Sequence, residues 1–513
     1  MSVLIAAAPI LVVSIGALLL MLSEAFGKPA SPEGYGPGGI IVDAGAGRSS
    51  ELGLGAAVVL FVGALVSLAV WMVGPEKLGT SDLAPYLMMD RFALFFCFVL
   101  CLGGGIAALL AGGYLPEHQL DRAEFFPLLL FSTVGAMALS AAGDLLTLFV
   151  ALETMSLGVY SMIGLRRGSP RASEAALKYF LLGSFAAALM LFGGALLYGA
   201  TGHTDLAGIG SGLMSAGKAG STVSIPVALI GVTLTIVGLA FKVSAVPFHM
   251  WTPDAYEGAP TPATGYMAAA VKTAAFAILL RVLLVSFGDA RLMSWGAGWP
   301  PALAVLSVLS MTAGNLIAGR QDSVKRMLAY SSIAHAGYAL VGVVAAMKAG
   351  GAMASVLFYM FAYSVSTVGA FGALILCGRR GAEAVSYSDL AGLGKRHPGA
   401  ALAFAVFLLS LTGAPPFAGF FGKLYVFSAA IDAELYALAV IGLLNSVVGA
   451  YYYLKVLVFM YMREPEPGAP IATPMSSGLV NSALVIAAVL VLLLGLLPGT
   501  TLDFAQAATL AGR

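Results

Sequence analysis

The stretch GLAFKVSAVPFHMW, residues 238–251, decides the fold. It places Lys242 and Pro247 inside a run that is otherwise apolar enough to lie in a membrane. Proline has no backbone N–H and clashes with the carbonyl four residues earlier, here that of Val243. An opened helical turn beside a lysine can take up water or orient the ammonium group. The stretch therefore predicts a broken membrane helix with a functional lysine near the break.

The whole chain has the composition of a membrane protein. Of its 513 residues, 60% are hydrophobic and only 10% are charged, whereas soluble domains are about a quarter charged. Many apolar runs exceed the roughly 20 residues that a helix needs to cross the hydrocarbon core. We therefore predict an all-α integral membrane protein with about 14 transmembrane helices. The predicted spans are residues 2–23, 52–73, 92–112, 124–141, 144–163, 173–198, 226–248, 262–287, 300–318, 324–347, 352–377, 400–428, 435–461 and 477–498.

The segments between the spans hold no further domain. Stretches 27–51, 199–225 and 464–476 predict loops. The first apolar run lacks a basic start and a cleavage site, so we expect a retained helix. The three cysteines lie inside apolar runs without CxxC spacing, so no metal or iron–sulfur ligand set is expected. They are Cys97, Cys101 and Cys377.

Basic residues between the spans predict an orientation. Fourteen of the 26 Lys and Arg residues fall on the side of the loop that holds Arg166, Arg167 and Arg171, and six fall on the other side. Because cytoplasmic loops carry an excess of Lys and Arg, we expect both termini to face the outside, the periplasm in a bacterium.

The remaining six basic residues lie inside predicted spans. Glu153 is the only acid deep in a span, and Asp144 lies at the edge of the same helix. Each such charge costs several kcal/mol unless it is paired, hydrated or neutral. Arg281 and Lys455 lie near span ends, so we expect them to snorkel to an interface. The six are Lys178, Lys242, Lys272, Arg281, Lys423 and Lys455.

The deeper charges have three interpretations: ion pairs between helices, a site for an organic solute, or a proton path. Burial favours a neutral lysine and a nearby carboxylate favours a charged one, so a lysine between both influences can change protonation when its partner moves. Static pairing cannot hold Lys178, Lys242, Lys272 and Lys423 with Glu153 alone. The imbalance favours transport over a structural role.

A second broken helix is predicted in SLTGAPPFAGFFGKLY, residues 410–425. Pro415 and Pro416 interrupt the span, and Lys423 follows Pro416 by two helical turns. Discontinuous helices in two halves of a chain indicate a transporter built from repeats. His335, in YSSIAHAGY, lies mid-span between Lys272 and Lys423 in chain order, with serines beside it. It is either a packing residue or a relay member.

Four motifs carry a resemblance to a known family. They are ETMSLGVYSM, FKVSAVPFHMWTPDAYEGAPTPATGYMAAAVKTAAF, SVKRMLAYSSIAHAGY and LTGAPPFAGFFGKLYVF. From about residue 90 to 460, in order and spacing, the chain resembles the antiporter-like proton-translocating subunits of respiratory complex I. A lysine at position 423 is typical of the N and L branches of this family, whereas the M branch carries glutamate there. The chain ends about fifteen residues after its last predicted span, so the long lateral helix of the L branch is expected to be missing, which leaves the N branch.

The resemblance implies two inverted five-helix repeats, helices 4–8 and 9–13, with helices 7 and 12 broken. The implied parts are residues 1–123, 124–287, 300–461 and 477–513. It also implies a proton relay. Glu153 would pair with Lys178, Lys242 would be the central switch, Lys272 would pass the proton on, and His335 would link that point to Lys423 at the exit side.

The resemblance implies no cofactor in this chain. NADH, FMN, iron–sulfur clusters and quinone would belong to partner subunits of the NADH:quinone oxidoreductase, and this chain would respond through its buried charges as a translocase subunit. The expected partners are other membrane subunits, among them subunit M and the small multi-helix subunits, and the lipid bilayer; no nucleic acid is expected. The expected location is the bacterial inner membrane.

Three alternatives remain. A subunit of a multisubunit Na⁺/H⁺ antiporter would have the same helix scheme. A secondary transporter for an organic solute would need a compact polar cluster, whereas the deep charges here are distributed over five or six helices. A structural membrane anchor would tolerate neutral replacement of Lys242.

Overall fold

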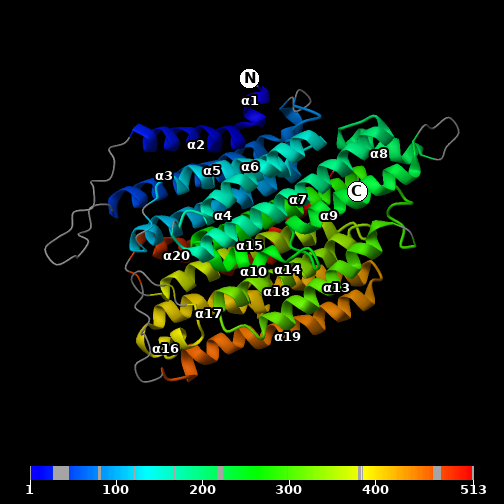
Figure 1. Cartoon of the computed structure of the whole chain (residues 1–513). Coiled ribbons are helices and arrows are strands. Elements are labelled where there is room, and N and C mark those ends of the chain that lie inside the picture. The colour runs from blue at the N-terminus through cyan, green and yellow to red at the C-terminus, as the bar shows by residue number, and fades with distance from the viewer. Residues whose placement is uncertain are drawn as a thin grey trace.

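The fold is a bundle of long helices that lie side by side, with α2 and α3 along one edge and α19 along the other (Figure 1). The structure is a computed structural model. It describes residues 2–26, 46–78, 83–118, 120, 122–166, 168–216, 223–296, 298–378, 383, 385–465, 475 and 477–510. All the regular structure within these ranges is helical, which confirms the all-α membrane fold.

The predicted spans coincide with helices. Within the described ranges, twelve helices are long and apolar enough to cross a membrane. The remaining two predicted spans correspond to the shorter α5 and to the pair α17 and α18. The N-terminal helices are α1 (Ser2–Ala6), α2 (Ala8–Phe26), α3 (Ala46–Val73) and α4 (Arg91–Glu117). They are followed by α5 (Phe125–Ser140), α6 (Leu145–Ile163), α7 (Pro170–Thr201), α8 (Leu206–Ser215), α9 (Ile225–Lys242) and α10 (Trp251–Gly258).

One continuous helical segment, Thr261–Ser286, joins α11 (Thr261–Tyr266) to α12 (Lys272–Arg281). Its two π-helical turns are η3 (Met267–Val271) and η4 (Val282–Ser286). The later helices are α13 (Trp299–Ala318), α14 (Val324–Ala345), α15 (Ala352–Leu376), α16 (Leu393–Arg396), α17 (Pro398–Thr412), α18 (Ala418–Asp432), α19 (Tyr436–Met462), α20 (Gly478–Leu496) and α21 (Pro498–Ala507).

The prediction of a loop at 199–225 was wrong in part. Helix α8 lies inside this stretch, capped by Asp205, whose side chain accepts from the Gly208 N–H. The glycine-rich sequence of α8 did not predict a helix, because glycine lowers helix propensity. The close contact with η4, where the Ser286 hydroxyl donates to the Leu206 carbonyl at 3.0 Å, stabilises it. Residues 27–45 of the first predicted loop, and most of 464–476, lie outside the described residues.

Both predicted helix breaks are confirmed. Between α9 and α10 the chain is not helical, and Ser244 adopts a φ of +63° there. Between α17 and α18, Gly413 has a φ of +89°. The first break opens at Lys242 rather than at Pro247, because the left-handed residue ends the helical hydrogen bonds before the proline is reached. Pro415 and Pro416 both lie within the second break.

The core holds the helices that carry the candidate residues. Every residue of α15 is buried, and α4, α14 and the segment Thr261–Ser286 are almost as enclosed. In contrast, less than a quarter of the residues in the most apolar stretch of α2 are buried. Polar groups on the central helices therefore face neighbouring helices.

Candidate functional site

Lys242 occupies the first break. It ends α9 and is 2% exposed. Its ammonium donates to the Ser156 hydroxyl of α6 at 2.9 Å and lies 3.5 Å from the Tyr160 hydroxyl. The ammonium also lies 5.8 Å from the ring centres of Tyr160 and Tyr179, within the range of cation–π attraction. Hydroxyl groups and aromatic rings thus surround the Lys242 ammonium.

Glu153 lies one turn before Ser156 on α6. Residues three apart share a helix face, so the carboxylate lies on the side of α6 that meets Lys242. Its Oε1 atom is buried and accepts no hydrogen bond from the described residues. A buried acceptor without a partner is costly, so this oxygen is suited to a proton or a water.

The structure does not support the implied pairing of Lys178 with Glu153. Lys178 Nζ lies 2.6 Å from Glu174 on the same helix and 2.8 Å from Asp254 on α10. Its side chain is 44% exposed, so Lys178 is less deeply placed than its span suggested. Asp254 lies on α10 after the first break, outside every predicted span.

Lys272 begins α12 directly after the π-helical turn η3 and is 2% exposed. Its ammonium donates to the Ser332 carbonyl at 2.7 Å and to the Ser332 hydroxyl at 2.5 Å. π-helical turns inside α-helices are frequent at functional sites. The lysine therefore links the segment Thr261–Ser286 to α14.

His335 lies one turn after Ser332 on α14 and is 5% exposed. Its Nδ1 lies 2.7 Å from the Tyr359 hydroxyl and its Nε2 lies 3.1 Å from the Tyr453 hydroxyl. Tyr453 also hydrogen-bonds the Ser331 hydroxyl. Both ring nitrogens thus face tyrosine hydroxyls, each of which can either donate or accept a hydrogen bond.

Lys423 lies on α18 beside the second break and is 7% exposed. Its ammonium donates to the Thr412 carbonyl at 2.7 Å and to the Ser446 hydroxyl at 2.9 Å. Thr412 ends α17, so its carbonyl belongs to the negative end of a helix dipole. The break supplies the acceptor that the ammonium needs.

Of the four lysines that are buried among the described residues, three share one property. In the part of the chain that the structure describes, neither Lys242, Lys272 nor Lys423 lies within ion-pair distance of a carboxylate. The interpretation as ion pairs between helices therefore fails for these three. Helix α14 connects the later groups: Lys272 donates to Ser332 on it, His335 lies on it, and the Lys423 ammonium lies 5.1 Å from the ring centre of its Tyr338. In contrast, Lys242 and Lys272 share no hydrogen-bond partner among the described residues.

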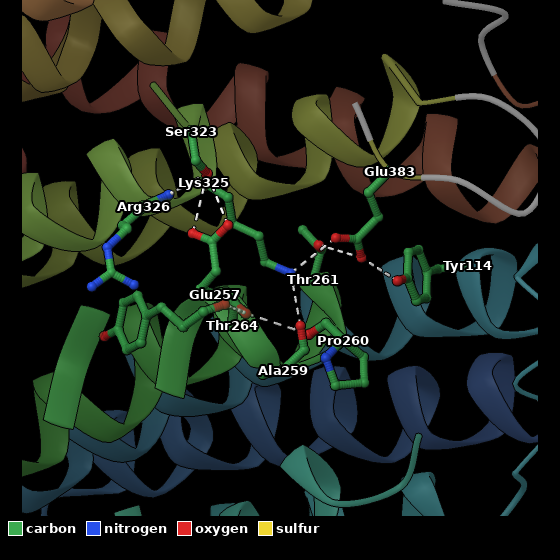
Figure 2. A network of polar contacts seen from close by, with 11 residues as sticks. Tyr114, Glu257, Ala259, Pro260, Thr261, Thr264, Ser323, Lys325, Arg326 and Glu383 are labelled. Atoms are coloured by element: carbon green, nitrogen blue, oxygen red, sulfur yellow. Dashed lines mark hydrogen bonds and ion pairs between the residues drawn. The ribbon is translucent and has the colours of Figure 1, made fainter. Parts of the chain in front are cut away.

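A buried ionic network was missed by sequence reasoning (Figure 2). Lys325, assigned from the sequence to a loop, is 1% exposed and donates to Glu383 at 3.0 Å and to the Ala259 carbonyl at 2.7 Å. Glu383 also accepts hydrogen bonds from Tyr114 and Thr261. Burial would raise the pKa of Glu383, but the Lys325 ammonium and these hydrogen bonds lower it from 4.5 to about 2. The sequence signal that could have pointed to this region is the pair of acids in the run PDAYEGAP, Asp254 and Glu257.

Arg281 does not snorkel as expected. Its side chain is 3% exposed, and it forms two hydrogen bonds of 2.8 Å with Asp90. Asp90 also caps α4 through the Ala93 N–H, so the pair joins α12 to the start of α4. The Lys455 ammonium lies 4.1 Å from the ring centre of Tyr387.

No cluster of three or more His, Cys, Asp or Glu side chains that could hold a metal occurs among the described residues. Cys97, Cys101 and Cys377 are buried and free.

Comparisons with known proteins place the chain in one family. The transmembrane family described as NADH:quinone oxidoreductase/Mrp antiporter matches residues 142–449. NADH-quinone oxidoreductase subunit N 1 of Sorangium cellulosum is 67% identical over 512 residues, with 99% of each chain covered. Subunit N of Trichlorobacter lovleyi is 44% identical over 435 residues, with 83% of this chain and 85% of the relative covered.

Solved structures share the fold. A chain of respiratory complex I from Thermus thermophilus with bound aureothin aligns with a TM-score of 0.74 and 32% identity, covering 98% of this chain and all of the other. A chain of the Mrp complex from a Dietzia species aligns with a TM-score of 0.79 over 98% of this chain and 96% of the other, but at 21% identity it shows the fold alone. The chain therefore belongs to the NADH:quinone oxidoreductase/Mrp antiporter membrane family and, within it, to subunit N of the NADH-quinone oxidoreductases.

Proposed function

We propose that this chain is a proton-translocating membrane subunit of an NADH:quinone oxidoreductase. It would move protons through Glu153, Lys178, Lys242, Lys272, His335 and Lys423. NADH, FMN, iron–sulfur clusters and quinone would be held by partner subunits. The membrane subunits beside this chain would be subunit M and the small multi-helix subunits. The chain would act without a redox centre of its own, as a translocase subunit in the bacterial inner membrane.

One observation carries the proposal. Three lysines are buried beside helix breaks or π-helical turns, and their ammonium groups meet hydroxyls, carbonyls and rings. A buried ammonium without a counter-ion is costly, so no ion pair fixes these groups in the charged state. Such groups can release and rebind a proton when a neighbouring charge changes. Closely coupled groups of this kind titrate together.

The two breaks support a division into two related halves, residues 124–287 and 300–461. Each half contains an interrupted helix with a buried lysine at the interruption. In the first half the lysine ends the helix before the break, and in the second it lies in the helix after it. This reversed placement fits an inverted relation between the halves.

The proposal is tested with Glu153→Gln and Lys242→Ala in the native host. Assembled enzyme, NADH-driven quinone reduction and proton uptake are measured in membrane vesicles. Normal assembly with collapsed turnover and uptake supports the relay. If oxidation and uptake are both unchanged in both variants, the buried charges are structural and the proposal fails.

A multisubunit Na⁺/H⁺ antiporter subunit remains the second candidate, because the Mrp chain shares the fold over almost the whole length. Sodium-dependent proton movement without NADH would favour it. The 67% identity with a subunit N favours the first candidate.

A further inference from the structure

Asp254 holds two cations from different halves of the chain. Its Oδ2 accepts from Lys178 Nζ on α7 at 2.8 Å, and its Oδ1 accepts from Arg326 Nη1 on α14 at 3.0 Å. Lys178 also pairs with Glu174 at 2.6 Å. Two cations and two carboxylates therefore balance. Each oxygen of Asp254 serves one cation, so a change at one cation alters the field at the other.

Two further contacts fix α10 to the start of α14 (Figure 2). The Ser323 hydroxyl, which also caps α14, lies 3.1 Å from both carboxylate oxygens of Glu257. Lys325 donates to the Ala259 carbonyl at 2.7 Å. We call these three contacts, Asp254–Arg326, Glu257–Ser323 and Ala259–Lys325, the α10–α14 clamp.

Helix α10, which carries one side of the clamp, also contacts the residues around Lys242. Trp251 begins α10, donates from its ring nitrogen to the Phe241 carbonyl at 3.1 Å and stacks on Tyr179 at 4.1 Å. Tyr179 follows Lys178 on α7, and its ring centre lies 5.8 Å from the Lys242 ammonium. A displacement of α10 relative to α7 therefore changes the walls around Lys242.

At its other end the clamp acts on the helix of the second half. α14 begins with the clamp residues and carries Ser332 and His335 two and three turns further on. Ser332 accepts both hydrogen bonds of Lys272. Because α14 is a continuous, buried helix, a shift at its first turn reaches these contacts as a movement of the whole element.

We propose that Asp254 is a positioning residue that couples Lys178 to α14 by sharing its carboxylate between Lys178 and Arg326. When Lys178 is charged, Asp254 divides its attraction between α7 and α14. When Lys178 is neutral, Asp254 is held by Arg326 alone and α10 follows α14. The inference rests on the proposed relay and assigns its coupling between halves to this acid, in place of the expected Glu153–Lys178 pair.

The test uses the assembled enzyme in native membranes and a double-mutant cycle of Asp254→Asn and Arg326→Gln. Each single variant is expected to lower NADH-driven proton uptake about tenfold at normal assembly, within the range of coupling between sites. Arg326→Gln is expected to have no further effect once Asp254 is asparagine, because it acts through that acid. Asp254→Glu should restore at least half of the uptake, which a shape defect would not allow. Lys395→Gln, in an exposed ion pair with Glu464, is the matched control and should match the parent enzyme.

Lys242→Ala is measured in parallel to separate the two proposals. If proton uptake collapses in Lys242→Ala but is full in Asp254→Asn and Arg326→Gln, the coupling role of Asp254 is overturned and the proposed relay stands. Full uptake in all three variants overturns the relay itself. Independent, multiplying effects of the two clamp substitutions also contradict the shared carboxylate. If Asp254→Asn does not assemble, Arg326→Gln decides, since it leaves the Lys178–Asp254 pair in place. Loss of assembly in both variants shows a purely structural clamp and overturns the proposal.

Discussion

Replacing Glu383 with glutamine should destabilise the subunit by a predictable amount. Glutamine keeps the shape of the side chain and can still accept a hydrogen bond from Thr261, but it removes the charge opposite Lys325. That lysine is 1% exposed and would keep only the Ala259 carbonyl as acceptor. An uncompensated charge would then remain buried between α11, α14 and α4.

The magnitude follows from the pKa of Glu383. The environment lowers this pKa from 4.5 to about 2, a difference of about 2.5 units, and each unit corresponds to 1.36 kcal/mol. The ionised carboxylate therefore contributes about 3 kcal/mol, in the range of roughly 3–5 kcal/mol for breaking a buried pair by removing one partner. The side chain is 15% exposed, so solvent screens the pair only weakly.

The pH dependence has a definite sign. A carboxylate whose folded pKa is lowered stabilises the fold fully above its unfolded pKa and loses that contribution as the pH falls through the folded pKa. The difference between parent and Glu383→Gln should thus be complete at pH 7 and shrink from about pH 4.5 towards pH 2. The groups that face Glu383 are Lys325, Tyr114, Thr261 and, more distantly, His118 and Arg166. Burial lowers the pKa of His118.

The assay is the temperature at which half of the assembled complex is lost from native membranes. For a chain of 513 residues, a loss of about 3 kcal/mol should lower it by roughly 3 °C. Glu464→Gln removes one partner of an exposed pair, with side chains 71% and 82% exposed, and should leave the temperature unchanged because surface pairs contribute little. Equal temperatures for Glu383→Gln and the parent at pH 7 would refute the reasoning.

Three further predictions concern other parts of the bundle. Gly413→Ala should lower thermal stability by about 1–2 kcal/mol, because φ is +89° and a Cβ would lie 3.0 Å from the stem of Lys423 on α18. Gly399→Ala near the start of α17, with open space around its Cβ, is the control, and equal losses would contradict the strain argument. Arg281→Gln should cost on the order of 2 kcal/mol in thermal unfolding through loss of its two charged hydrogen bonds to α4, whereas an unchanged melting temperature would indicate that the pair is dispensable. Tyr453→Phe should slow NADH-driven proton uptake several-fold at normal assembly, because it removes the hydroxyl on His335 Nε2; uptake equal to that of the parent would exclude this hydroxyl from the relay.

The helices and both breaks could be predicted from the sequence because their signals are local. Apolar runs of membrane length and prolines within them mark spans and interruptions without knowledge of neighbouring helices. Helix α8 could not be found in this way. Its sequence LAGIGSGLMS has low intrinsic helix propensity, and its stability comes from tertiary contact with η4.

The candidate site was only partly predictable, because burial is a property of the bundle. Lys325 lies at the very start of the predicted span 324–347 and Glu383 lies outside every predicted span, yet the packing of α4, α11 and α14 encloses both side chains. Lys178 lies inside an apolar run, yet its side chain is half-exposed and reaches Asp254 across a helix break. The partner of a charged side chain depends on which helices the fold brings together. The spacing of residues along the chain therefore does not predict which two charges will pair.

Lys272 offers the most direct test of the central claim, because Ser332 is the only hydrogen-bond partner of its ammonium among the described residues and this contact joins the first half of the chain to α14. Lys272→Met keeps the apolar stem and removes the amine. NADH-driven proton uptake into vesicles, normalised to assembled complex, is the measurement. The account predicts normal assembly with uptake reduced at least about tenfold, because a positioned proton-transfer group contributes roughly 100-fold or more. Normal assembly with undiminished uptake would contradict it.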